Sequence, residues 1–386
     1  MKNIFSTQWK FGNMLLYIAI VVCFLLIAYY HLDSGFSMSS DSERFSRWAD
    51  DLIRLDFNLY EFFSIDKVSH RPSLFFFSVP VVLIALCKVI FVNEWQFAFL
   101  ILNLSLVFFS LIIFVKCLLL IKVKPVFISL TLPLILISVD ILIWPKFILS
   151  DMIYAFLVLL GVYFIIKGII NNKINYLELS IIIFLLFASR PSSIPVVFAI
   201  VFFIIISRFQ IFLRQKNIIL FILLIFISIP FILGLAYLFI EFNFNDIAKV
   251  DFLTGMVKDG MIIHDRPETW VKEPKNFIDV VYIYFLRLIN FFNPYASTFS
   301  VVHIALNAIQ IVLILFSIFI WSFFGVHIKI HDKVFLFILL LSFSVAAFHS
   351  FILIDYDWRY RFPIILPLIL LFPISLEIIV KKICND

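Results

Sequence analysis

Runs of about 20 apolar residues recur along the whole chain, separated by short polar connections. A helix of that length can cross the hydrocarbon core of a bilayer. The runs do not alternate between apolar and polar residues, as barrel strands do. Ten runs are predicted to span, at residues 12–31, 96–115, 126–145, 152–170, 175–189, 193–207, 217–240, 300–325, 334–353 and 362–380. The pattern therefore predicts an all-α polytopic integral membrane protein.

One further apolar segment, residues 74–92, is harder to place. It is apolar enough to span, but it follows Arg71-Pro72, contains Pro80 and carries Lys88. If it does not cross, the predicted cytoplasmic loops hold twelve basic residues, namely Lys116, Lys122, Lys124, Lys167, Lys173, Arg208, Arg214, Lys216, Lys329, Lys333, Lys381 and Lys382. The short external connections then hold four, namely Lys146, Arg190, Arg359 and Arg361. The positive-inside rule favours this arrangement, so we predict an interfacial or re-entrant helix.

The resulting topology places both termini in the cytoplasm, since Lys2 and Lys10 precede the first span. Two longer external loops follow, at residues 32–95 and 241–299, within a single integral membrane domain of residues 1–386. The second loop holds six more basic residues, which count less because the rule applies to short loops.

The first external loop has an amphipathic stretch at residues 42–66. Its apolar residues recur at helical spacing among acidic and basic ones, namely Phe45, Trp48, Leu52, Leu55 and Leu59. Such a pattern is typical of helices that lie on a membrane surface. We therefore expect interfacial helices in this loop.

Composition agrees with the hydrophobic pattern and excludes several classes of protein. The chain is 64% hydrophobic and 14% charged, so it has too much apolar surface for a soluble domain of 386 residues. The net charge of +5 fits cytoplasmic anchoring and gives no reason to expect a nucleic-acid partner. The four cysteines are widely separated and predict neither a disulfide framework nor a zinc site.

The first strongly polar stretch contains the acidic pair Asp41 and Glu43, with Arg44 and Arg47 close behind. One interpretation is a solvated loop whose acids cap an interfacial helix, which is the commoner role of such residues. The other is a catalytic loop that faces the far side of the membrane. Both interpretations stay open on this stretch alone.

Three further acids lie in or beside predicted spans. Asp151 follows Ser150 directly before an apolar run, where either residue could serve as a helix N-cap. Asp140 lies inside an apolar run, where an acid usually faces a cavity or a partner. Glu178 lies near the predicted cytoplasmic end of its span and is expected at the interface. In the predicted topology, Asp151 shares the external face with Asp41.

Charged and aromatic residues also cluster at residues 355–363, at the predicted outer end of a span. They form an aromatic belt with snorkelling arginines on one interpretation. On the other, the guanidinium groups of Arg359 and Arg361 grip phosphate oxygens, since an Arg fork binds phosphate through two hydrogen bonds. Arg190, at another outer boundary, would supply a further cation.

The second predicted external loop, at residues 241–299, gives little indication of function. His264-Asp265 is too short a pattern to predict a metal site, and Trp270 could stack on a sugar or belong to a plain loop. The chain contains no nucleophile-elbow, phosphate-loop or zinc-protease motif.

The acidic Asp41-x-Glu43 motif after the first span resembles the first-loop motif of the GT-C superfamily of membrane glycosyltransferases. The nearest branch includes the protein O-mannosyltransferases and the aminoarabinose transferases. Four later elements resemble motifs of this branch, namely Arg71-Pro72-Ser73-Leu74, Ile148-Leu149-Ser150-Asp151, Ser189-Arg190-Pro191 and Arg359-Tyr360-Arg361-Phe362-Pro363. Their order and spacing over most of residues 1–375 carry the resemblance.

This resemblance implies a GT-C-like bundle of about ten spans that transfers a sugar from a polyprenyl-phosphate-linked donor to a lipid or glycan acceptor. It implies catalytic roles for Asp41, Glu43 and Asp151. It implies that five residues bind the substrates, namely Arg71, Arg190, Arg359, Tyr360 and Arg361. Some GT-C enzymes use a divalent metal and others do not, so a metal stays open and no cofactor is assigned. The reaction would take place on the external, periplasmic face of a bacterial inner membrane.

Two alternatives compete with this expectation. A polymerase of polysaccharide or O-antigen repeat units would also be polytopic, and its function would depend on the loop at 241–299. A flippase or transporter of lipid-linked sugars would carry charges deep within several spans and some internal symmetry. Only Asp140 lies clearly deep in the sequence pattern, and no repeat is evident. The sequence does not identify the sugar, the acceptor or the pathway.

Overall fold

The computed structural model describes residues 2–69, 74–209, 277–295, 299–324, 329–351 and 358–385. Over these ranges the chain is helical, and its extended pairing is a single parallel bridge between Ser37 and Phe147. The predictions for Arg71, for the span at 217–240, and for residues 241–276 and 355–357 lie outside the described residues.

Most helices follow the predicted runs, but α13 lies within the predicted external loop at 241–299, and the predicted run at 362–380 is divided into α16 and α17. Their bounds are α1 Lys2–Ser34, α2 Ser40–Arg54, α3 Leu59–Ser69, α4 Ser78–Phe91, α5 Trp95–Leu120, α6 Pro125–Leu136, α7 Val139–Ile143, α8 Asp151–Asn171, α9 Tyr176–Ser189, α10 Ile194–Phe209, α13 Phe277–Phe291, α14 Val301–Phe324, α15 Lys329–Phe351, α16 Phe362–Ile369 and α17 Leu371–Asn385. Five 3₁₀ turns join some of them, namely η1 Phe75–Phe77, η2 Val92–Glu94, η3 Trp144–Lys146, η4 Pro191–Ser193 and η6 Trp358–Arg361.

Six segments of the described chain are long and apolar enough to cross a membrane, which makes this a polytopic helical membrane protein. They are Gly12–Ser34, Phe75–Leu120, Asp151–Asn171, Val301–Phe324, His331–Ser350 and Arg359–Ile383. The predicted span at 126–145 is broken into α6 and α7, bent by 60°, and would be a seventh. Helices α9 and α10 have 14 and 16 residues, fewer than a straight span needs. The count of ten spans therefore stays a prediction.

Helix α4 forms most of the segment that was hard to place from sequence. Its 14 residues give a length of about 21 Å, against a hydrocarbon core of about 30 Å. The amino group of Lys88 donates to Asp50 Oδ1 at 2.7 Å and to Ser46 Oγ at 2.8 Å, which joins α4 to α2. Lys88 therefore has charged and polar partners on an amphipathic helix, and these contacts favour the interfacial prediction.

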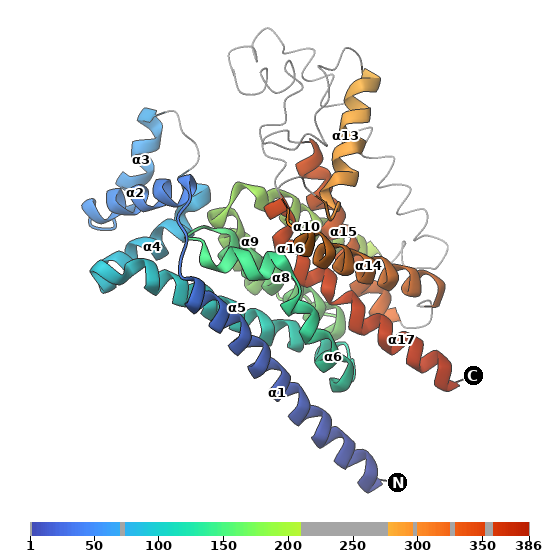
Figure 1. Cartoon of the computed structure of the whole chain (residues 1–386). Coiled ribbons are helices and arrows are strands. Elements are labelled where there is room, and N and C mark those ends of the chain that lie inside the picture. The colour runs from blue at the N-terminus through green and yellow to red at the C-terminus, as the bar shows by residue number, and fades with distance from the viewer. Residues whose placement is uncertain are drawn as a thin grey trace.

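Helices α2 and α3 occupy the stretch predicted to be amphipathic. Phe45, Ala49 and Leu52 form the buried face of α2, whereas Glu43 and Arg47 on the same helix are exposed. Figure 1 shows α2 and α3 at the upper left, beside α4, and both chain termini at the lower right. The amphipathic helices and the termini therefore lie at opposite ends of the molecule.

Helix α8 lies inside the bundle and positions the site. It packs against α5, α9, α15 and α16, and most of its side chains are buried (Figure 1). At the end with the termini, Glu377 accepts a hydrogen bond from the backbone N–H of Lys124 at 2.9 Å and pairs with Lys381 at 2.8 Å. This buried carboxylate satisfies an N–H at the start of α6, which would otherwise lack a helical partner.

The predicted topology can be tested by cysteine labelling from outside the cell in a variant without the four native cysteines. A probe at Glu43, exposed on α2, is expected to react with a membrane-impermeant maleimide. Probes at Lys122 and Lys173, both exposed at the other end, are expected to stay protected until the membrane is permeabilised. Labelling of the Lys122 probe from outside would contradict the ten-span arrangement.

Candidate functional site

Asp41 lies in the first turn of α2, and the capping of this helix leaves its carboxylate available. Ser39 is the N-cap, and its hydroxyl accepts from the backbone N–H of Ser42 at 3.3 Å. The Ser42 hydroxyl accepts in return from the backbone N–H of Ser39 at 3.0 Å, which completes a capping box. The expectation that the acids themselves cap the helix is therefore wrong for α2. Asp41 instead reaches across to other elements.

Asp151 is the first residue of α8, and the chain before it is held in place on both sides. The backbone N–H of Ser37 donates to the carbonyl of Lys146 at 2.8 Å, and that of Ile148 donates to the carbonyl of Ser37 at 3.3 Å. The side-chain amide of Asn103 donates to the carbonyl of Phe147 at 3.1 Å. Because three segments converge here, the start of α8 has a fixed position.

The two central arginines come from short breaks between helices. Arg190 ends α9 in extended conformation, with φ −166° and ψ 139°, directly before the turn η4. The hydroxyl of Tyr154 on α8 donates to the carbonyl of Ser192 at 2.7 Å, which ties that turn to α8. Arg359 lies in η6, directly before α16. Both guanidinium groups thus extend from backbone that is held close to α8.

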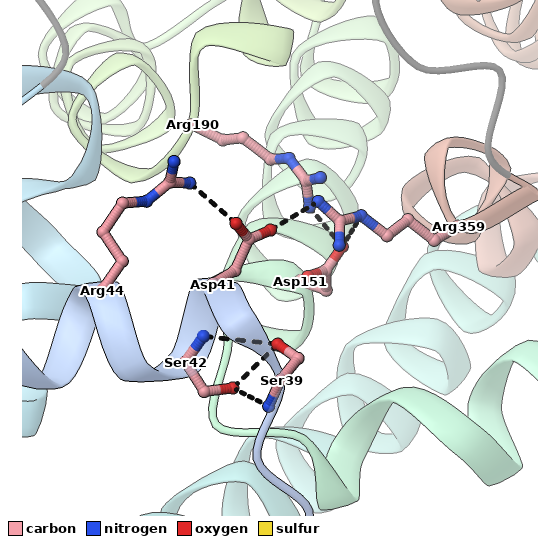
Figure 2. A network of polar contacts seen from close by, with 7 residues as sticks. All are labelled: Ser39, Asp41, Ser42, Arg44, Asp151, Arg190 and Arg359. Carbon is pink, nitrogen blue, oxygen red and sulfur yellow. Dashed lines mark hydrogen bonds and ion pairs between the residues drawn. The ribbon is translucent and has the colours of Figure 1, made fainter. Parts of the chain in front are cut away.

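These side chains meet in one cluster, which we call the carboxylate–arginine cluster, made of Asp41, Arg44, Asp151, Arg190 and Arg359 (Figure 2). Asp41 pairs through one oxygen with Arg44 at 2.9 Å and through the other with Arg359 at 3.2 Å. Asp151 pairs with Arg190, and its Oδ1 lies 3.9 Å from Arg359 Nε. Arg359 therefore bridges the two carboxylates, which are 110 positions apart in sequence.

Burial divides the cluster into an inner and an outer pair. The side chains of Asp151 and Arg190 are 1% and 6% exposed, whereas those of Asp41 and Arg359 are 28% and 18% exposed. Removing charges from water is costly unless they are paired, so the inner pair needs its ion pair. The outer pair is partly exposed and can therefore exchange partners with an incoming ligand.

The charges in the cluster do not balance. Three guanidinium groups and two carboxylates leave a net charge of one positive unit. Oδ2 of Asp151 is buried and accepts no hydrogen bond from the described residues. The cluster therefore favours an anion, and it offers one buried carboxylate oxygen that can accept from a hydroxyl.

The ring of Tyr360 lies close to the guanidinium groups of Arg190 and Arg359. Its ring stacks on His349, with centroids 4.2 Å apart and an angle of 21° between the planes. The guanidinium carbons of Arg190 and Arg359 lie 5.2 and 5.7 Å from its centroid, within the range of a cation–π contact. This aromatic face orients both guanidinium groups.

Arg361 was predicted to act beside Arg359, but it points to a different partner. Its Nε lies 3.4 Å from Asp140 Oδ2, and its Nη1 donates to the carbonyl of Asn293 at 3.2 Å. The side chain is 5% exposed, which also excludes a snorkelling arginine that extends toward the interface. Asp140 thus has a cationic partner, as expected of an acid inside an apolar run.

Glu43 does not join the cluster. It is exposed on α2, and a separation of two residues rotates a helical side chain by about 200° relative to Asp41. The two acids therefore extend from opposite sides of α2. Arg71, the remaining candidate, lies outside the described residues.

A divalent metal site in a protein is built from several oxygen, nitrogen or sulfur ligands that converge on one point. No group of three or more His, Cys, Asp or Glu side chains gathers in the described part of the chain. Both carboxylates of the cluster face guanidinium groups, which repel a cation. The donor set of the carboxylate–arginine cluster therefore does not fit a divalent metal.

Sequence reasoning missed three residues that build this site, namely Ser39, Asn103 and His349. The spacing of Ser39 and Ser42 matched a capping pattern, with Ser in place of the usual Glu or Gln at the third position. Asn103 was visible as an amide within an apolar run. No local pattern marked His349 as the partner of Tyr360.

No protein-family model matches this chain, and comparisons with curated proteins and with solved structures find no match.

Proposed function

We propose that this protein is a membrane glycosyltransferase that moves a sugar from a polyprenyl-phosphate-linked donor to an acceptor on the external face of the membrane. The observation that supports this most strongly is the carboxylate–arginine cluster. Four separate elements contribute to it, and it lies beside α2, away from the chain termini (Figures 1 and 2). In this proposal the protein acts in cell-surface glycan or lipid modification in a bacterial inner membrane.

The proposed reaction needs a base and a group that binds an anion. In the outer pair, Asp41 can act as the base and Arg359 can bind the anion. The carboxylate of Asp41 takes the proton from an acceptor hydroxyl, whose oxygen attacks the anomeric carbon of the sugar. The bond between that carbon and the phosphate oxygen breaks, and the polyprenyl phosphate leaves with the electron pair. Arg359 and Arg190 stabilise the negative charge that develops on this leaving group.

The arrangement of the cluster fits this role because Arg359 is already oriented. Asp41, Asp151 and Tyr360 hold its guanidinium group, so little reorganisation is needed when a phosphate arrives. A phosphate that binds the fork through two oxygens would displace Asp41 from Arg359. That exchange would free Oδ2 of Asp41 to act on the acceptor, while Oδ1 stays paired with Arg44.

The topology proposed with this function has ten spans, cytoplasmic termini and an external cluster. It is supported by the distribution of basic residues and by the separation of the cluster from both termini (Figure 1). It also places Lys122 and Lys173 on the cytoplasmic side, where the positive-inside rule expects them.

The function can be tested with the purified full-length protein in liposomes. A panel of polyprenyl-phosphate-linked sugars is added together with lipids extracted from bacterial membranes, and the release of polyprenyl phosphate is measured. A glycosyltransferase is expected to release polyprenyl phosphate and to glycosylate the acceptor fraction with one or more members of the panel.

Other outcomes would identify the alternatives. Movement of the intact donor across the bilayer without cleavage would indicate a flippase. Release of polyprenyl diphosphate from lipid-linked repeat units, with none from the monophosphate donors, would indicate a polymerase. Either result would contradict the proposal.

A further inference from the structure

Three aromatic rings lead to the two central arginines, and we call them the aromatic stack, made of Phe291, His349 and Tyr360. The centroids of His349 and Tyr360 are 4.2 Å apart, with 21° between the ring planes. The ring of Phe291 lies almost parallel to that of His349, with 9° between the planes and 6.2 Å between the centroids. The three residues belong to α13, α15 and η6, so the stack joins three separate elements.

His349 is the residue of the stack that contacts both of the other rings. It is 7% exposed, and Phe291 is 5% exposed. The ring of Phe348 meets the imidazole edge-on, with centroids 5.4 Å apart and 90° between the planes. A buried imidazole with ring neighbours in two orientations has little freedom to turn. Tyr360 therefore packs on a support whose orientation is fixed.

The two arginines beside the stack carry like charges, which repel each other. Two groups hold them together. Asp151 Oδ1 pairs with Arg190 and lies 3.9 Å from Arg359 Nε. The ring of Tyr360 attracts both guanidinium groups, whose carbons lie 5.2 and 5.7 Å from its centroid. Because both guanidinium groups reach the same carboxylate oxygen and the same ring, one phosphate group can contact both.

We infer that His349 is a positioning residue of this site. Through Tyr360 it fixes the orientation and spacing of the guanidinium groups of Arg190 and Arg359, which bind the phosphate of the donor. This inference rests on the proposed function, which assigns that phosphate to the two arginines. His349 contacts Tyr360, and Tyr360 contacts the arginines, so the effect of His349 on the phosphate is indirect.

The orientation of the arginines matters because of how a guanidinium group binds phosphate. Two parallel hydrogen bonds form only when the planar fork faces the phosphate oxygens. A long Arg side chain has many rotamers, and a fixed aromatic face limits them before the phosphate binds. The charge on the leaving phosphate develops in the transition state, where groups that are already oriented stabilise it most. Loss of the support should therefore lower turnover more than it weakens the binding of the donor.

Replacement of His349 by Leu is expected to reduce the turnover of sugar transfer about tenfold, because the flat support of Tyr360 is lost. Leu is apolar and similar in volume, so the space stays filled. His349→Phe keeps a ring that can stack on Tyr360 and is expected to stay within about twofold of the wild-type turnover. The rate of polyprenyl phosphate release by the full-length protein in liposomes measures both. Equal turnover in the two variants would mean that His349 only fills space, and would overturn the inference.

A matched control lies at the other end of the same helix. Phe335 of α15 stacks on Trp321 of α14, with centroids 4.8 Å apart and 8° between the planes. Phe335→Leu removes a buried stack of the same kind without changing the cluster. It should lower the melting temperature as His349→Leu does, but leave turnover unchanged. An equal loss of turnover in Phe335→Leu would attribute the effect to stability and contradict a positioning role. His349→Met also lacks a flat ring and makes the same comparison if the Leu variant does not fold.

The indirect route through Tyr360 can be tested with a double-mutant cycle. In a Tyr360→Leu protein, the ring that His349 supports is already gone. The addition of His349→Leu should then reduce turnover by less than about twofold more, whereas two independent effects would multiply. A further loss of about tenfold in the double variant would show that His349 acts by another route, and would overturn the inference.

Phosphate binding separates failure of this inference from failure of the proposed function. Farnesyl phosphate is titrated into the full-length protein in detergent, and its dissociation constant is measured by calorimetry. His349→Leu should raise this constant about threefold, and His349→Phe should leave it nearly unchanged. If this order of binding is found but the wild-type protein releases no polyprenyl phosphate from any donor, the glycosyltransferase proposal fails, and the role of His349 in phosphate binding stands. Normal transfer and normal binding in His349→Leu would contradict the inference alone. A wild-type protein that neither binds farnesyl phosphate nor releases polyprenyl phosphate would overturn both.

Discussion

Replacement of Asp41 by Asn is expected to reduce the turnover of sugar transfer by about 10²–10⁴-fold, the usual contribution of a general base. The amide keeps the shape of the carboxylate and can still hydrogen-bond to Arg359, but it does not take a proton from the acceptor. Because the capping box of α2 uses Ser39 and Ser42, the helix should still form. The measurement is the rate of polyprenyl phosphate release in liposomes at saturating donor.

A matched control is available two residues away. Glu43→Gln also removes one carboxylate from the first turn of α2, but Glu43 is exposed and makes no ion pair with the described residues. The structure therefore predicts nearly normal turnover for Glu43→Gln, although the resemblance to GT-C enzymes assigns it a catalytic role. Near-normal turnover in Asp41→Asn combined with loss in Glu43→Gln would transfer the role of base to Glu43 and contradict the mechanism.

Replacement of Arg359 by Lys is expected to reduce turnover about 10²-fold, although the positive charge is kept. An ammonium group does not span Asp41 and Asp151 as the guanidinium group does, and it does not bind two phosphate oxygens in a plane. The loss should be seen mainly in turnover, because the charge on the phosphate develops in the transition state. Steady-state kinetics with a varied donor would measure it.

The control for this prediction is Arg54→Lys, at the end of α2. The side chain of Arg54 is 75% exposed and pairs with Asp51 within the same helix. A surface ion pair of this kind contributes little, so the variant should behave like the wild-type protein. Unchanged kinetics in Arg359→Lys would mean that charge alone matters there, and would leave Arg190 as the partner of the phosphate.

The sequence by itself determined most of the helices and many of their ends, although it predicted a loop where α13 lies. Apolar runs of membrane length have few alternatives to a helix, because every backbone N–H and C=O in the bilayer must be satisfied locally. Asp151 was correctly placed at a helix start, since Ser150 and the apolar run that follows are local features. The amphipathic spacing likewise identified α2 and α3. The hydrophobic pattern did not predict the break between α6 and α7, which divides the predicted span at 126–145.

The tertiary structure alone decided which charges meet. Asp41 and Arg359 are 318 positions apart, and no local pattern pairs them. The sequence predicted that Arg359 and Arg361 act together, because they are close in the chain. In a 3₁₀ turn, however, a separation of two residues rotates the side chain by about 240°, so the two arginines face different acids. About 200° of rotation along α2 separates Asp41 from Glu43 in the same way.

Two polar side chains show the same division between sequence and structure. Lys88 argued from sequence against a span, but only the packing of α4 on α2 revealed Ser46 and Asp50 as its partners. Gln310 lies within an apolar run of the sequence, and only the structure places it beside Arg361 and Asn307. The hydrophobic pattern of a sequence predicts which side chains are removed from water when the chain folds. The partners of a buried polar group depend on how distant segments pack, and this information is not local.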